Sequence, residues 1–242
     1  MRKSRIFTTQ HLECGKQLVL EEGARRHIVN VLRLKVGSEI ILFNGEGGQY
    51  TGIISNCSKN RLEIRVTNFS NTSLESHLTT SVAICISRGD RMDWVIQKAT
   101  ELGASYITPI ISERVTVNLS SDRAKKRLAH WRKVSISSCE QCGRNVLPKI
   151  DEPIKLDCWL KAVRSNLKYV LDQSGGNIDF TQSKPSSIAL LSGPEGGFSK
   201  NELKLAQSFD FIPISLGKRT MRAETAPIAA LTIAQTNWGD LC

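Results

Sequence analysis

Strand-like and helix-like segments alternate over the last two thirds of the chain, and this alternation constrains the fold more than any other feature. Short apolar runs typical of strands lie at residues 81–87, 106–111, 169–172, 187–191 and 211–216. Helical spacing of apolar residues occurs at 91–102, 122–142, 201–208 and 226–238. Parallel strands need a connection about as long as a helix, so this pattern is typical of an α/β domain around a mostly parallel sheet. We expect that domain to span residues 73–242.

The first part of the chain has a different pattern, with several short strands and one helical segment. The expected strands are residues 17–20, 38–43, 50–55 and 61–67, and the expected helix is 21–33. Short strands that close on themselves build a small β-barrel. The polar stretch at residues 68–73 is typical of a linker. We therefore expect a separate barrel domain over residues 1–72.

Basic residues are in excess. The chain has 33 lysines and arginines against 23 aspartates and glutamates, a formal net charge of +10. Residues 1–72 carry half of this excess in less than half of the length. Such a charge favours a polyanionic partner, most often nucleic acid, although a merely soluble basic protein is the alternative.

Composition narrows the class of protein further. A hydrophobic content of 40% with 23% charged residues is typical of a folded globular chain. No apolar run approaches the roughly 20 residues of a membrane helix. Polar residues follow the basic start of the chain, where a signal peptide would have its apolar core. We expect a cytoplasmic protein.

The seven cysteines do not indicate a metal centre. Only Cys139 and Cys142 form a C-x-x-C pair, and no second pair or H-x-H motif accompanies them. A closed zinc site takes four ligands. We expect reduced, mostly structural thiols and no metal.

The strongest local motif is a glycine-rich turn at residues 190–199, between a predicted strand and a predicted helix. Ser199 and Glu202 have the spacing of a capping box, which defines the start of that helix. Glycine-rich turns at sheet ends bind ligands in α/β domains, although an ordinary tight turn is the alternative. The turn matches neither a phosphate-binding loop nor G-x-G-x-x-G. ATP hydrolysis and dinucleotide redox chemistry are therefore disfavoured.

A second turn, at residues 216–227, also follows a predicted strand. Thr225 can cap the last helix, with Pro227 in its first turn. The two turns can form opposite walls of one pocket. Arg222 and Glu224 can equally be a structural ion pair.

The long helix at 122–142 has a basic stripe formed by Arg123, Lys126, Arg127, His130 and Lys133. The stripe is either a solvated face or a contact for phosphates. Gly143 fits the end of this helix, so Arg144 would project beside the stripe.

Five motifs give the sequence a family resemblance. They are QKATELG at 97–103, SER at 112–114, EQCGR at 140–144, GPEGGF at 193–198 and LGKRTMRAETA at 216–226. In this order, and with Arg2, Arg5 and Arg33 near the start, they resemble the SPOUT-class family of 16S ribosomal RNA (uracil-N3)-methyltransferases over nearly the whole chain. The family usually has a bulky aliphatic pair where this chain has Thr220 and Met221.

The resemblance implies an N-terminal PUA-like barrel for RNA and a C-terminal α/β methyltransferase domain with a trefoil knot. It implies S-adenosylmethionine as the methyl donor, 16S rRNA of the small ribosomal subunit as the substrate, and a homodimer. The expected donor-binding residues are Leu171, Leu191, Gly193, Glu195, Gly196, Gly197, Leu216, Gly217, Met221, Arg222, Thr225 and Ala226. The expected RNA-binding residues are Arg2, Arg5, Arg33, Arg114, Arg123 and Lys126.

Methyl transfer from a sulfonium depends on in-line geometry more than on a protein nucleophile. N3 of uridine must lose its proton, and a guanidinium near O2 or O4 would stabilise the resulting anion. By the matched motifs and by this charge argument, Arg144 and Arg222 are the catalytic candidates. Glu224 or a water molecule would take the proton, and the uridine would have to leave its stack.

Two other functions fit part of the sequence. A non-enzymatic RNA-binding ribosome-assembly factor would share the barrel, the charge and the basic stripe. A uridine isomerase would need an aspartate nucleophile in a strand-end loop, and none can be singled out. The two glycine-bearing turns favour the methyltransferase, because a protein that only binds RNA does not need them.

Overall fold

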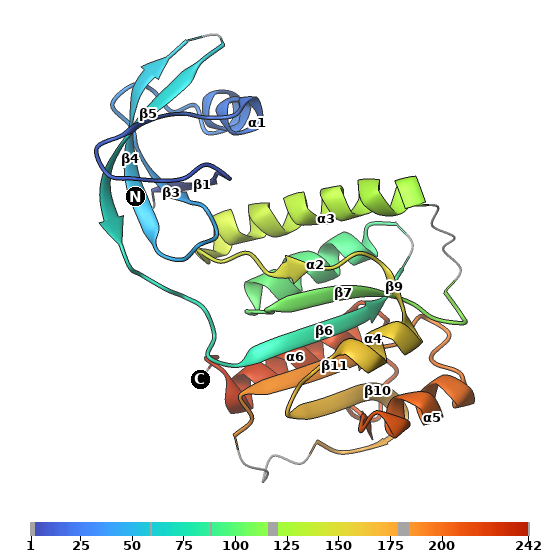
Figure 1. The fold of residues 1–242 in the computed structure, drawn as a ribbon. Coiled ribbons are helices and arrows are strands. Elements are labelled where there is room, and N and C mark those ends of the chain that lie inside the picture. The colour runs from blue at the N-terminus through green and yellow to red at the C-terminus, as the bar shows by residue number, and fades with distance from the viewer. Residues whose placement is uncertain (1–2, 59, 88, 116–120, 179–183, 242) are drawn as a thin grey trace. The chain divides into compact units, whose positions relative to one another are not determined.

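The computed structural model describes residues 3–241 except 59, 88, 116–120 and 179–183. The chain folds into two compact units (Figure 1). The first unit contains Met1–Glu75 and Cys139–Leu147, and the second contains Ser76–Ser138 and Pro148–Cys242. Among the described residues, no helix is both long and apolar enough to cross a lipid bilayer.

The first unit is built on a mixed five-stranded sheet in the order β1-β3-β4-β5-β2. Its strands are β1 (Ser4–Phe7), β2 (Gln17–Val19), β3 (Glu39–Phe43), β4 (Gln49–Cys57) and β5 (Leu62–Ser70). β1 pairs with β3 in parallel, whereas the other pairs are antiparallel. Alternate residues such as Ile40, Leu42 and Ile64 form its buried core, as expected for strands with one covered face.

The helix expected at 21–33 is shorter and irregular. Helix α1 (Glu22–Arg26) continues into a π-helical turn over His27–Val31. Ile28 is the buried residue of that turn and packs into the core of the first unit. Arg33 follows with a positive φ of 52°, which ends the helical geometry.

The segment Cys139–Leu147 is held within the first unit by polar contacts. The Glu140 carboxylate accepts a hydrogen bond from the backbone N–H of Phe7 at 3.0 Å. Asn145 accepts from the Arg5 guanidinium and donates from its amide to the carbonyl of Thr72 at 2.7 Å. Burial raises the pKa of the Glu140 carboxyl.

The second unit is a parallel α/β sheet in the order β12-β10-β11-β6-β7-β8, with β9 also paired to β7. Its strands are β6 (Thr79–Cys85), β7 (Tyr106–Ile111), β8 (Lys149–Ile150), β9 (Ile154–Lys155), β10 (Leu167–Gly176), β11 (Ser187–Ser192) and β12 (Ile212–Ile214). Every described pairing in this sheet is parallel. The α/β class expected from the alternation is confirmed, whereas the trefoil knot stays a prediction.

Helices cover both faces of this sheet (Figure 1). They are α2 (Arg91–Glu101), α3 (Ser121–Cys142), α4 (Leu156–Ala162), α5 (Lys200–Ser208) and α6 (Thr225–Trp238). Residues of α2, α3 and α6 share one buried cluster with the sheet, and residues of α4 and α5 share another. The sequence prediction missed α4, β8 and β9, because these elements are too short to show periodicity.

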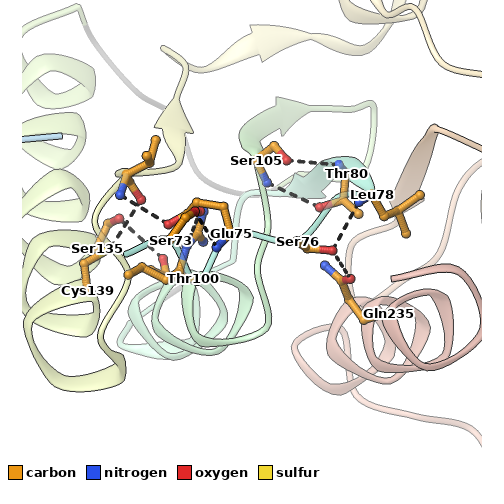
Figure 2. Close-up of polar contacts among 12 residues, drawn as sticks. Ser73, Glu75, Ser76, Leu78, Thr80, Thr100, Ser105, Ser135, Cys139 and Gln235 are labelled. Carbon is orange, nitrogen blue, oxygen red and sulfur yellow. Dashed lines mark hydrogen bonds and ion pairs between the residues drawn. The ribbon is translucent and has the colours of Figure 1, made fainter. Parts of the chain in front are cut away.

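Polar contacts fix the entry of the chain into the second unit (Figure 2). The Ser76 hydroxyl donates to the side-chain oxygen of Gln235 at 2.7 Å and accepts from the backbone N–H of Leu78 at 3.2 Å. The hydroxyls of Thr80 and Ser105 each accept a hydrogen bond from the other residue's backbone N–H. These contacts set the start of β6 against α6 and against the residues that lead into β7.

Candidate functional site

A cavity of about 340 Å³ lies where β10, β11 and β12 end, within the second unit. Because these strands are parallel, their carboxyl ends lie at one edge of the sheet, the usual place for ligands in α/β folds. The cavity is lined by Leu171, Asp172, Gln173, Ser192, Gly193, Pro194, Glu195, Gly196, Gly197, Ile214, Ser215, Leu216, Gly217, Arg219, Thr220, Met221, Ala223 and Ala226.

The first wall is the turn between β11 and α5. Gly197 has a φ of +66°, and its N–H donates to the carbonyl of Pro194 at 2.8 Å, which closes a tight turn. Ser199 and Glu202 form the capping box expected from the sequence, so α5 begins at a fixed point. Gly193 faces the Phe198 ring, which a Cβ atom would approach to 3.1 Å.

The second wall is the turn between β12 and α6. Gly217 has a φ of +109°, a conformation that favours glycine. Leu216 and Met221 give this wall apolar side chains. Residues of both turns line this one cavity, as the sequence predicted.

The third wall, at the end of β10, was not expected as a whole. Asp172 and Gln173 line the cavity, and the Gln173 amide donates to the Thr220 hydroxyl at 2.6 Å. The pairing between β10 and β12 is irregular between Leu171 and Gly176. A Cβ atom on Gly175 would lie 2.5 Å from the backbone nitrogen of Ile214, so only glycine lets the two strands approach here.

Nine of the twelve residues expected to bind the donor line this cavity. They are Leu171, Gly193, Glu195, Gly196, Gly197, Leu216, Gly217, Met221 and Ala226. Leu191 is buried in the core beneath the first turn instead. Arg222 and Thr225 are exposed and do not line the cavity.

Charged side chains join the two turns. The guanidinium of Arg91 donates to the Glu195 carboxylate, and its Nε lies 4.0 Å from Oε1 of Glu224. The same Glu224 oxygen lies 3.9 Å from Nη1 of Arg222, whose side chain is 80% exposed. Its other carboxylate oxygen, Oε2, is buried and has no hydrogen-bond partner among the described residues. Arg91 was not expected here, and no local sequence signal identifies it.

Arg144, expected to be catalytic, belongs to the first unit. Its side chain is buried, and it donates to Oε2 of Glu75 from Nε at 2.9 Å and from Nη2 at 2.7 Å. The backbone N–H of Val146 donates to the other oxygen of Glu75 at 3.2 Å. The structure therefore gives Arg144 a structural contact, and its catalytic role stays a prediction.

The expected RNA-binding residues have different surroundings. Arg33, Arg123 and Lys126 are exposed, whereas Arg2 lies outside the described residues. Arg5 donates to Gln49 at 2.5 Å and packs over the ring of Phe43, so it is tied into the first unit. Arg114 donates to the carbonyl of Gly196 at 2.6 Å, which places it beside the cavity.

No group of three or more potential metal ligands occurs in the part of the chain that the structure describes. Cys139 is buried and Cys142 is half-buried, at the end of α3. A hydrogen bond with Cys142, together with burial, raises the pKa of the Cys139 thiol. A thiol that resists ionisation is a poor metal ligand and a poor nucleophile.

Two family models define the class of protein. Residues 74–235 match the RNA methyltransferase domain, and residues 20–67 match the RNA methyltransferase PUA domain. The fold and the cavity thus belong to an RNA methyltransferase with a PUA-like domain. The methyltransferase interpretation therefore prevails over the non-enzymatic assembly factor.

Named relatives narrow the class to one family. The chain is 35% identical to the ribosomal RNA small subunit methyltransferase E of Buchnera aphidicola subsp. Schizaphis graminum, with 99% of this chain and 98% of the relative covered. It is 29% identical to the protein of the same name from Bacillus subtilis, covering 93% and 92%. The chain belongs to the ribosomal RNA small subunit methyltransferase E family.

Two solved methyltransferase structures are similar to this chain over its whole length. A methyltransferase of Legionella pneumophila, solved with bound cofactor SAM, is 36% identical with a TM-score of 0.95, and both chains are fully covered. The ribosomal RNA small subunit methyltransferase E of Neisseria gonorrhoeae, bound to S-adenosyl methionine, is 37% identical with a TM-score of 0.93, again over both whole chains.

Proposed function

We propose that this protein transfers the methyl group of S-adenosylmethionine to N3 of a uridine in 16S rRNA of the small ribosomal subunit. The observation that carries the proposal is the cavity between the two glycine-bearing turns, in a chain of this family. The donor is implied by the two structural neighbours that hold it. A ribosomal substrate is consistent with a cytoplasmic location.

The residues of the cavity suit this donor. Its volume, about 340 Å³, lies in the range of small-molecule sites. Leu171, Leu216 and Met221 offer apolar surface for a flat base, and the glycines expose backbone groups that can bind its polar edge. A Cβ atom on Gly197 or Gly217 would meet no atom within 4 Å, so both glycines border open space.

The bound donor supplies an electrophilic methyl group. The protein positions the uridine and accepts the proton that leaves N3. Glu224 is the candidate to accept the N3 proton, because its Oε2 is buried and has no hydrogen-bond partner in the part of the chain that the structure describes. The exposed guanidinium of Arg222 lies beside it and can stabilise the anion at O2 or O4. Arg144 remains the second cationic candidate.

The test is incubation with labelled S-adenosylmethionine and either small subunits or naked 16S rRNA, followed by nucleoside analysis. We expect label in 3-methyluridine. Label in another nucleoside would refute the N3 assignment, and no transfer to either substrate would refute the proposed reaction. The comparison of the two substrates also identifies the form of RNA that is methylated.

Gly197→Val is expected to weaken donor binding by about five- to a hundredfold. The φ of +66° is costly for a β-branched residue, by about 1–3 kcal/mol, so the turn would change its backbone conformation. Gly197→Asn is the matched control, since asparagine tolerates this conformation and is expected to retain most of the affinity. Calorimetry with S-adenosylmethionine measures both. Equal affinity of the valine variant and the wild type would contradict the prediction.

We propose that RNA phosphates contact Arg33 in the first unit and Arg123 and Lys126 on α3. A triple variant in which Arg33, Arg123 and Lys126 are each replaced by glutamine is expected to bind RNA more weakly. The slope of the logarithm of its binding constant against the logarithm of the salt concentration should be smaller in magnitude by about 2–3. The three side chains are exposed, so folding should not change. Arg5 is left intact because it is bonded within the first unit. An unaltered salt dependence would exclude these residues from the RNA interface.

We also propose that the protein is a homodimer, which rests on the family resemblance. Sedimentation equilibrium would measure its mass in solution. A mass near 26.9 kDa, that of one chain, at all concentrations would contradict the proposal.

A further inference from the structure

Three charged side chains from separate parts of the second unit meet beside the cavity. Arg91 is the first residue of α2, Glu195 belongs to the turn after β11, and Glu224 belongs to the turn after β12. The Arg91 guanidinium donates to Glu195, and its Nε lies 4.0 Å from Glu224. One cation thus reaches one carboxylate of each turn.

We infer that Arg91 is a positioning residue that ties the two turns of the cavity together and thereby sets its affinity for the methyl donor and for the demethylated product. The inference rests on the proposed function, because it takes the cavity as the site of the donor. Arg91 is not among the residues that line the cavity, so it acts through Glu195 and Glu224.

The fold explains why a residue of α2 can reach both turns. β6 lies beside β11 in the sheet and runs parallel to it, so the chain leaves both strands at the same edge. α2 is the helix that follows β6, and its first residue therefore lies near the turn after β11. The contact joins residues that are 104 positions apart in the sequence.

Arg222, the other cation near Glu224, cannot have this role. Arg222 and Glu224 belong to the same turn, so their pair leaves the turn after β11 unattached. Arg114 cannot have this role either, because its hydrogen bond reaches the turn after β11 and not the turn after β12. Its guanidinium donates to the carbonyl of Gly196 at 2.6 Å. Within the described residues, Arg91 is the cation whose ion pairs reach both turns, one through Glu195 and the other through Glu224.

The geometry uses a property of arginine that lysine lacks. The guanidinium presents Nη1 to one carboxylate and Nε to the other, in a planar fork that keeps its charge. A lysine ammonium is a point charge on a flexible stem and would favour one of the two partners. Arg91→Lys should therefore retain only part of the function.

The effect should be local to the cavity. The Arg91 and Glu195 side chains are 44% and 49% exposed, and exposed ion pairs contribute little to global stability. Arg114 continues to hold the turn after β11 when Arg91 is removed. We expect a moderate loss of affinity and only a small change in folding stability.

The test compares Arg91→Met with the wild type by calorimetry, using S-adenosylmethionine and S-adenosylhomocysteine as separate ligands. We expect both to bind about three- to tenfold more weakly, with Arg91→Lys intermediate and the melting temperature within about 2 °C. Hydrogen exchange should become faster in residues 192–199 and 216–225 together. Lys98→Met is the matched control, because it removes an ion pair within α2, to Glu101, that touches neither turn.

Two results would overturn the inference. Unchanged affinities and exchange rates in Arg91→Met would show that the turns hold their positions without it. A change in the affinity for S-adenosylmethionine alone, in either direction, would show that Arg91 acts through the charge of the sulfonium, which the product lacks, and not through the positions of the turns. If the wild type binds neither ligand, the proposed function fails, and the exchange rates of the two turns still decide whether Arg91 ties them.

Discussion

Gly175→Ala is expected to abolish measurable binding of S-adenosylmethionine and to destabilise the second unit by about 3 kcal/mol. A Cβ atom at this position would lie 2.5 Å from the nitrogen of Ile214, 2.5 Å from the carbonyl carbon of Pro213 and 2.6 Å from its oxygen. These are backbone atoms of β12, so no side-chain rotation can relieve the contact. β12 would have to move away from β10.

Such a movement would open the cavity, because its walls depend on this contact. Ile214 and Ser215 line the cavity directly, and the backbone N–H of Ser215 donates to the carbonyl of Gly176 at 2.8 Å. The turn at residues 216–225 begins immediately after them. A displacement of β12 would therefore separate the second wall of the pocket from the third.

The neighbouring glycine provides a matched control. A Cβ atom on Gly176 would meet no atom within 4 Å, and its φ is not in the positive region. Gly176→Ala should therefore leave both the denaturation midpoint and the donor affinity close to those of the wild type. Urea denaturation and calorimetry measure the two variants side by side. The prediction is wrong if the two variants differ by less than threefold in affinity and have equal midpoints.

Gly175 also shows where sequence patterns stop being informative. The apolar run at 169–172 predicted a strand, but the strand continues to Gly176 through two polar residues and two glycines. The continuation is irregular, and its form depends on β12, which lies far along the chain. A tight approach between two backbones leaves no periodic signal, so the third wall of the cavity was missed.

The two glycine-bearing turns could be predicted because their signals are local. The end of a buried strand, the glycines and a capping box lie together at residues 190–202, and the structure has the turn and the box there. Long-range pairs could not be found in this way. Arg91 and Glu195 are 104 residues apart, and Arg144 and Glu75 are 69 apart. Nothing in the neighbourhood of either arginine indicates its partner.

Arg144→Ala is expected to destabilise the first unit by about 3 kcal/mol, because it would leave the Glu75 carboxylate without its guanidinium. The pair is largely buried, with side-chain exposures of 6% for Arg144 and 22% for Glu75. Glu75 also accepts from the backbone N–H of Val146 at 3.2 Å, so it connects the end of the first segment of this unit to Cys139–Leu147. Loss of the arginine should loosen that connection.

A second variant separates this structural role from catalysis. Adding Glu75→Gln to Arg144→Ala removes the unpaired charge, and a glutamine oxygen can still accept from Val146. We therefore expect the double variant to recover part of the lost stability in urea denaturation. Arg61→Ala is the matched control in the same unit, since its pair with Glu63 leaves the arginine 60% exposed and should contribute less than about 1 kcal/mol.

Turnover decides what else Arg144 does. If its contact with Glu75 is its whole role, the double variant should regain methyl transfer as it regains stability, per mole of folded protein. If Arg144 instead stabilises the uridine anion, the double variant should be stable and still slow, with an unchanged affinity for S-adenosylmethionine. A stable Arg144→Ala single variant that is inactive would refute the structural role, because an unpaired, largely buried carboxylate cannot leave the unfolding free energy unchanged.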